Sequence, residues 1–246
     1  FVVNTYTTNN QGNFHEGHPG YGGPVVEKLS SGGYVIAWTS DGQDGSDLGI
    51  FGQVFDKNNN KVGSEFLINS YLPNKAIMPK IASYEDGKFI ATYSSGGDGS
   101  NFGAFGQIFN SDGTKNGTEF QINTNTFDSQ YSSDLTILNN GNSIVTWASY
   151  HTHSSTNNEH EIYAQIIDES GSKVGSEFRV NDILIGGQGQ PSISKLSDGN
   201  VIIVWESPKV AFTDVFDVKA QILDNSGNKI NDEFYINSYT DDDQSE

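Results

Sequence analysis

Two Asp- and Gly-rich loops carry the residues whose oxygen atoms could bind a metal ion. The first loop reads SDGQDGSD over residues 40–47, and the second reads SGGDGSN over residues 95–101. Ca²⁺ takes about six to eight oxygen ligands and needs a sharply turning backbone, which closely spaced Asp and Asn with intervening Gly can supply. The alternative is an ordinary Gly/Asp turn, because the terminal Glu of an EF-hand loop is missing. The sequence therefore predicts Ca²⁺ as a cofactor, with five candidate ligands: Asp41, Asp44, Asp47, Asp98 and Asn101.

Aromatic residues stand in the same kind of polar loop, where an exposed ring beside Asp, Asn and Gly suits the hydroxyls of a sugar. The alternative is that these rings cover the edges of the fold. The candidate ligand-binding residues are Tyr21, Phe102, Tyr150 and Phe212.

No catalytic arrangement is visible in the sequence. There is no Cys nucleophile, no GxSxG elbow and no HExxH motif, and carboxylates are too numerous for any pair to be chosen. The five histidines fall in two irregular places, 15–18 and 151–160, where a Zn²⁺ or Ni²⁺ site competes with simple solvation. We therefore expect a protein that is not an enzyme.

The elements that position these loops belong to a repeat. The segment EFLIN at 65–69 returns as EFQIN at 119–123, EFRVN at 177–181 and EFYIN at 233–237. An aromatic residue and a Gln recur with the same period of about 55 residues. These are Trp38, Tyr93, Trp147 and Trp205, and Gln53, Gln107, Gln165 and Gln221. Four full copies are present, and we expect each Gln to bond to the backbone of the next copy.

Each copy contains four short β-rich runs separated by Gly, Asn, Asp and Ser clusters, which is the pattern of meandering antiparallel strands. In the second copy these runs are 79–84, 88–93, 103–110 and 118–123. The sequence predicts an all-β fold, a β-propeller of about four blades, with a β-solenoid or open repeat array as the alternative. One repeat domain covers 1–246, with blade units 24–69, 79–123, 133–181 and 191–237.

The two ends of the chain match each other, because FVVNTYTTNNQ at the N-terminus resembles FYINSYTDDDQ at 234–244. The predicted N-terminal extra strand, 1–4, could close the ring, add an edge strand or pair with a neighbouring molecule. Exposed spare strands favour association. We therefore expect self-association through the terminal strands as one alternative.

Composition excludes several partners. Asp plus Glu number 31 against 13 Lys plus Arg, so the formal net charge is −18, which repels phosphate backbones and anionic membranes. No apolar run approaches the length needed to span a bilayer. We expect neither nucleic-acid binding nor membrane insertion. Cys is absent, which excludes disulfides.

One known repeat is similar to this chain. The run GGYVIAWTSDGQDGSDLGIFGQVFDKNNNKVGSEFLIN resembles a unit of large secreted bacterial proteins, many of which carry hemolysin-type (RTX) calcium repeats and are exported by type I systems. Those units typically read DGGFVVAWxSDGQDGSGxGIYAQRFDxxGxxVGxEFxVN. The likeness covers the whole chain and is sharpest in the first copy; the third and fourth copies replace the DGQDGS loop. The resemblance implies an extracellular, adhesive setting.

Together these patterns predict a non-catalytic, lectin-like adhesion module that binds carbohydrate at a cell surface or matrix. A structural or assembly unit of a large extracellular protein or filament is the first alternative. A glycan-cleaving enzyme, which would need a cleft with two carboxylates, is the second.

Overall fold

The computed structural model describes residues 1–12, 23–45, 47–70, 75–151, 159–184, 186–208 and 216–238. These residues form four antiparallel sheets of four strands each. Blade 1 contains β1 (Val25–Lys28), β2 (Tyr34–Asp41), β3 (Leu48–Phe55) and β4 (Lys61–Leu67), and blade 2 contains β5 (Ala76–Ser83), β6 (Phe89–Ser95), β7 (Gly103–Phe109) and β8 (Lys115–Gln121). Blade 3 contains β9 (Gln130–Ile137), β10 (Ser143–His151), β11 (Glu159–Ile167) and β12 (Lys173–Arg179), and blade 4 contains β13 (Gly189–Lys195), β14 (Val201–Pro208), β15 (Phe216–Leu223) and β16 (Lys229–Tyr235). The predicted all-β, propeller-type architecture of four-stranded blades is confirmed. No helix in the described ranges is long and apolar enough to cross a membrane.

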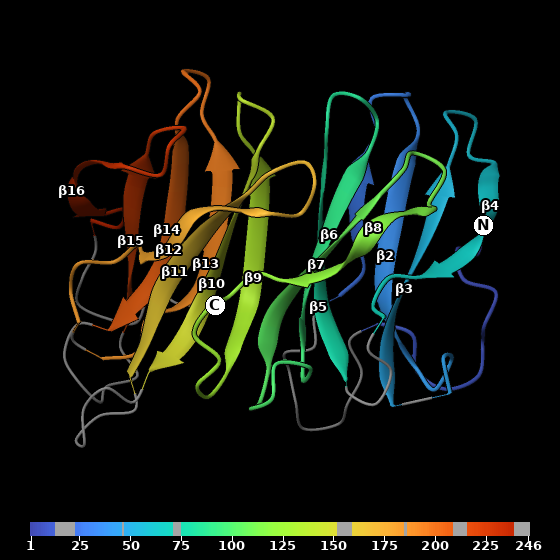
Figure 1. Ribbon diagram of the computed structural model, residues 1–246, viewed down its shortest axis with the longest axis horizontal. Helices are drawn as coiled ribbons and strands as arrows, with labels where there is room; N and C mark the ends of the chain where they lie inside the picture. The colour runs from blue at the N-terminus through green and yellow to red at the C-terminus, as the bar shows by residue number, and fades with distance from the viewer. Residues whose placement is uncertain are drawn as a thin grey trace.

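The blades stand side by side in chain order. Figure 1 shows blade 4 at one end of the long axis and blade 1 at the other. The first strand of each following blade packs on the middle strands of the blade before it: β5 on β2 and β3, β9 on β6 and β7, and β13 on β10 and β11. Blades 1 and 4 are therefore the two ends of an open row.

Glycine sets the hairpin between the first two strands of every blade. Gly32, Gly87, Gly141 and Gly199 have φ between 85° and 92°, a left-handed conformation that costs a residue with a Cβ more than it costs Gly. In the first of these turns the Gly32 N–H donates to Leu29 O at 2.9 Å. The same turn recurs because the same residue recurs.

The repeated Gln fills a bulge inside its own blade. The register of β3 and β4 shifts between Gly52 and Val54, on either side of Gln53. Gln53 is fully buried, and its Nε2 donates to Val54 O at 3.0 Å and Val62 O at 3.2 Å. The other three glutamines do the same. The expected bond to the next blade is therefore wrong, because the bulge frees carbonyl groups closer by.

The core lies between blades rather than inside any one of them. One apolar cluster joins Val35 and Ile50 of blade 1 to Phe89 and Tyr93 of blade 2. Two similar clusters join blades 2 and 3 and blades 3 and 4. The recurring aromatic residues are at most 4 % exposed; Tyr93, Trp147 and Trp205 are buried in these interfaces, whereas Trp38 lies on the outer side of blade 1. Each blade is therefore stabilised by its neighbours, as in other repeat proteins.

The Asn that ends each EFxIN motif caps the third strand of the same blade. Oδ1 of Asn69 accepts from Ile50 N–H at 2.8 Å, and Oδ1 of Asn123 accepts from Ala104 N–H at 2.9 Å. Asn181 and Asn237 repeat the bond with Ile162 and Val218. The motif is thus part of the scaffold.

The N-terminal residues differ from the expected strand. Residues 1–4 are extended but pair with no strand of the described chain; the nearest ladder contact is a bridge between Gln11 and Ser40. They lie on blade 1, where the ring of Phe1 packs on that of Phe55 at 5.5 Å. The segment is held by side-chain contacts instead of by a sheet.

Candidate functional site

The irregular segments gather at one end of the blades. In blade 2, both the loop between the second and third strands and the connection to blade 3 lie at this end, along the lower edge of Figure 1. We call it the loop end. The opposite end carries only the tight hairpins. Sequence variation between the copies is concentrated at the loop end, as expected for a recognition surface on a fixed scaffold.

The acidic loop of blade 1 is already occupied by protein contacts. Oδ2 of Asp47 forms an ion pair with Nζ of Lys75 at 3.0 Å. Asp44 folds over Gly49, where a Cβ would meet its Oδ2 at 2.5 Å. The backbone N–H of Asp41, at the end of β2, donates to Asn10 O at 3.0 Å. The side chains of Asp47 and Asp44 therefore contact different parts of the protein, and Asp41 is held through its backbone.

Blade 2 repeats part of this arrangement. Asp98 folds over Gly103 as Asp44 does over Gly49, and its Oδ1 accepts from Ser100 N–H at 3.0 Å. Asn101 points elsewhere, because its Nδ2 donates to Oδ1 of Asp128 at 3.1 Å. Within the described residues, no group of three or more His, Cys, Asp or Glu is close enough to hold a metal ion. The expected calcium-binding character is therefore contradicted for the described residues, and Ca²⁺ as a cofactor stays a prediction.

An aromatic cluster lies at the loop end of blade 3, beside blade 2. Tyr150 of β10 faces His160 of β11 directly across the ladder, and its ring is 5.2 Å from that of Tyr131 on β9. Asp128 precedes β9 and has a left-handed backbone with φ of 62°. Its bond to Asn101 ties the cluster to blade 2. Phenol, imidazole, carboxylate and amide groups thus meet at one place.

Burial sets the charge state of this cluster. Burial lowers the pKa of His160 to about 4, and the charge of Asp128 opposes the shift only in part. Burial also raises the pKa of Tyr131 well above its ordinary value, and its hydrogen bond with Tyr150 acts in the same direction. At neutral pH the imidazole is uncharged and the Tyr131 phenol is protonated. Among these groups the carboxylate is the charged one.

The structure brings some of the predicted residues together and separates others. Three predicted residues lie at the cluster: Asn101, Phe102 and Tyr150. Asn101 donates to Asp128, and Phe102 O accepts from the backbone N–H of Gln130, next to Tyr131. Asp41, Asp44 and Asp47 belong to blade 1. Tyr21 and Phe212 lie outside the described residues.

Sequence reasoning missed Asp128 and Tyr131, and it considered His160 only as a candidate Zn²⁺ or Ni²⁺ ligand. A signal for Tyr131 exists: copies two and four place Ile77 and Gly189 at the matching position, two residues before a Pro. A Tyr that replaces these residues in one copy only is a departure from the repeat, and such departures mark the places where copies acquire separate roles.

Other carboxylates on the first strands hold blades together. Oδ2 of Asp134 on β9 accepts from Ser192 Oγ at 2.9 Å and Ile193 N–H at 3.0 Å on β13. Glu27 on β1 accepts from Ser83 N–H and Oγ on β5, at 3.2 and 2.8 Å. These bonds cross between neighbouring blades, so both groups are already used by the scaffold.

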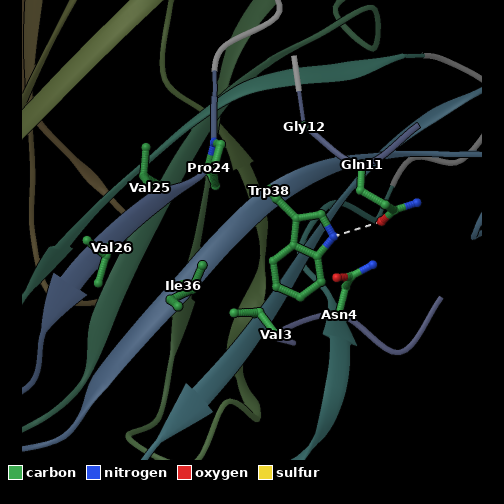
Figure 2. A pocket seen from close by; sticks show the side chains of 9 residues that line it. All are labelled: Val3, Asn4, Gln11, Gly12, Pro24, Val25, Val26, Ile36 and Trp38. Carbon is green, nitrogen blue, oxygen red and sulfur yellow. Dashed lines mark hydrogen bonds between the residues drawn. The ribbon is translucent and has the colours of Figure 1, made fainter. Parts of the chain in front are cut away.

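A cavity of about 370 Å³ opens on the outer side of blade 1. Figure 2 shows that residues from the N-terminal segment, β1 and β2 line it, with the Trp38 indole at its centre. Nε1 of Trp38 donates to Oε1 of Gln11 at 3.1 Å. The remaining lining is mostly apolar, including Val26 and Ile36. The described residues that line it include no charged side chain.

Comparisons with known proteins support the fold. No protein-family model and no curated protein matches the chain, so the relation to RTX-type repeats stays a prediction. A protein of unknown function from Dyadobacter fermentans is 12 % identical over 86 % of this chain and 68 % of its own, with a TM-score of 0.60. An endo-1,4-beta-xylanase from Bacteroides thetaiotaomicron is 13 % identical over 87 % of this chain and 76 % of its own, with a TM-score of 0.55. An alpha-L-arabinofuranosidase from Lactobacillus brevis is 12 % identical over 84 % of this chain and 74 % of its own, with a TM-score of 0.53.

At these identities the likeness establishes the fold. It also corrects the functional expectation. Two of these three structures are glycan-cleaving enzymes. This finding contradicts the prediction of a non-catalytic, lectin-like adhesion module.

Proposed function

We propose that the protein cleaves glycans at the loop end of blades 2 and 3. The observation that carries the proposal is the cluster of Tyr131, Tyr150 and Asp128, at the loop end of a fold that known xylan- and arabinose-directed enzymes share. Aromatic faces pack against the apolar face of a sugar ring, while nearby polar groups fix its hydroxyls. An extracellular setting belongs to the same proposal, because polymeric glycans are found there.

Asp128 is the carboxylate best placed to act on a sugar bound to these rings. Glycoside hydrolysis uses two carboxyl groups, one that protonates the leaving oxygen and one that activates water or attacks the sugar carbon. Asn101 orients Asp128 through the 3.1 Å hydrogen bond. The protonated phenol of Tyr131 and the neutral imidazole of His160 add no competing charge.

Asp98 is the second carboxyl group of the proposal. It precedes Asn101 by three residues in the same loop. Its Oδ2 is buried and makes no hydrogen bond to the residues described here. A buried carboxylate oxygen without a partner is uncommon, and this one would bond to a substrate oxygen once Asp98 turns away from Gly103.

Reducing-end release from arabinan, arabinoxylan and xylan tests this function. We expect Asp128→Asn to lose activity by about 10²- to 10⁴-fold, the range for a general acid or base. The matched control is Asp168→Asn at the opposite, hairpin end, where Asp168 only closes a turn with Ser170 and Ser172. Folded wild-type protein that releases no sugar from any of these polymers would refute the proposal, and equal losses in the two variants would refute the role of Asp128.

A further inference from the structure

Every internal junction between blades uses the same three contacts. We call the side of a blade that packs on the following blade its forward face, and the side that packs on the preceding blade its rear face. The Phe of each EFxIN motif covers a hairpin Gly of the following blade: a Cβ on Gly113 would meet Phe66 at 2.6 Å, and one on Gly171 would meet Phe120 at 2.7 Å. The apolar residue two positions later is fully buried, as at Ile68.

The third contact, which we call the carboxylate grip, is a hydrogen bond from a backbone N–H of the preceding blade to a Glu carboxylate of the following blade. The backbone N–H that follows each EFxIN motif donates to the Glu of the next motif. Ser70 N–H donates to Oε2 of Glu119 at 2.6 Å, and Thr124 N–H donates to Oε2 of Glu177 at 2.6 Å. The third junction repeats this bond between Asp182 and Glu233 at 2.7 Å.

Residues 1–5 repeat the carboxylate contact, and a contact between two Phe rings, on the rear face of blade 1. The ring of Phe1 lies 5.5 Å from Phe55, as Phe66 lies 5.3 Å from the equivalent Phe109. The Thr5 N–H donates to Glu65, and Thr5 Oγ1 donates to Oε2 of the same carboxylate at 2.8 Å. The segment FVVNT therefore takes the place of the end of a preceding blade.

Among the residues that the structure describes, none gives the forward face of blade 4 such a cover. Ile236 is 50 % exposed, although the matching Ile68, Ile122 and Val180 are fully buried, and Phe234 is 40 % exposed. The rear face of blade 1 is also only partly covered, because Val26 is 66 % exposed and borders the 370 Å³ cavity in Figure 2. The matching Leu135 and Ile193 are 7 % and 8 % exposed. The two ends of the row are the two halves of one blade junction.

We propose that two copies of this chain bind head to tail, with the forward face of blade 4 on the rear face of blade 1 of the second copy. Residues 234–238, FYINS, then replace residues 1–5, FVVNT, on Glu65 of the second copy. The occupant is a second copy because the contact continues the three junctions within the chain, and because both ends carry the same Phe and Asn spacing. Such a contact joins different surfaces of the two copies, so it repeats into a closed ring or a filament.

Sedimentation velocity over about a hundredfold range of protein concentration tests the proposal. We expect wild-type protein to associate and Ile236→Asp to remain monomeric. Val174→Asp is the matched control, since Val174 is 42 % exposed on β12, away from both end faces. Phe1→Ala weakens the competing segment and should tighten association by about fivefold, the order expected for one aromatic pair. Association of Ile236→Asp equal to wild type, or monomeric behaviour of both wild type and Phe1→Ala, would overturn the proposal.

A crosslink tests the geometry directly. The chain contains no Cys, so single introduced thiols react with each other alone. Mixing Ser238→Cys protein with Glu65→Cys protein under mild oxidation should give a mixed disulfide dimer. Ser238→Cys with Ser170→Cys, at a hairpin tip, is the control pair. Equal yields from the two mixtures would exclude head-to-tail docking.

Discussion

Replacement of Asn123 by Ala removes three hydrogen bonds at the end of blade 2. Asn123 is 2 % exposed, and its Oδ1 accepts from Ala104 N–H at 2.9 Å. Its Nδ2 donates to Asn125 O at 2.9 Å and to Gln130 Oε1 at 2.8 Å. The substitution leaves the Ala104 N–H buried without an acceptor, which costs about 1–3 kcal/mol. With the lost bond to Gln130, we expect a loss of about 3 kcal/mol in the free energy of unfolding.

Urea denaturation followed by circular dichroism measures this loss. For a chain of this length it corresponds to a fall in Tm of about 6–12 °C. Asn4→Ala is the matched control, because Asn4 holds the same place in FVVN but caps no strand and donates to Tyr6 O alone. We expect that variant to lose about 1 kcal/mol or less. If the two variants lose the same free energy to within about 0.5 kcal/mol, the capping role of the EFxIN Asn is refuted.

Three further predictions concern glycine geometry, a buried ion pair and pH. Gly171→Ala should lose about 1–3 kcal/mol more than Gly117→Ala in thermal melts, because both have positive φ but only Gly171 faces a ring at 2.7 Å. Lys219→Met should lose about 3–5 kcal/mol, since it leaves the Glu233 carboxylate, 2.8 Å from Nζ, buried without its cation; a double-mutant cycle with Glu233→Gln should recover most of it. Because the folded pKa of His160, about 4, lies below its unfolded value, stability should be complete above about pH 6.5 and should fall toward pH 4. After discounting for partial exposure this amounts to about 1–2 kcal/mol, and His160→Asn should lack that part of the acid loss in paired denaturation curves; unchanged acid sensitivity would contradict it.

The repeat made most of the strands predictable. In blade 2 the expected runs 79–84 and 103–110 agree closely with β5 and β7. The expected last strand, 118–123, begins later than the observed Lys115–Gln121. The difference arises from the bulge at Gly117, whose φ of 78° lets the strand start directly after the turn. A longer hairpin was expected because the GlyThr pair looks like a turn.

The candidate site was predictable only in part. Loop composition pointed to Asn101, Phe102 and Tyr150, since each stands in a polar segment that breaks the repeat. Asp128 and His160 join them through packing between blades and across a ladder, which no local pattern encodes. In the acidic loops, Asp47 pairs with Lys75, 28 residues away, while Asp44 and Asp98 each fold over a Gly five residues later; composition alone does not reveal these contacts.

The carboxylate grip between blades also decides how the molecule responds to tension. Each Glu holds the backbone just after the preceding EFxIN motif, so the bonds lie in series along the chain. A force on the two ends loads every grip equally and breaks them one at a time. Unfolding of one copy of about 55 residues, with its sheet as well as this bond, would release about 190 Å of extended backbone. The row of four blades would therefore lengthen under force in steps of equal size.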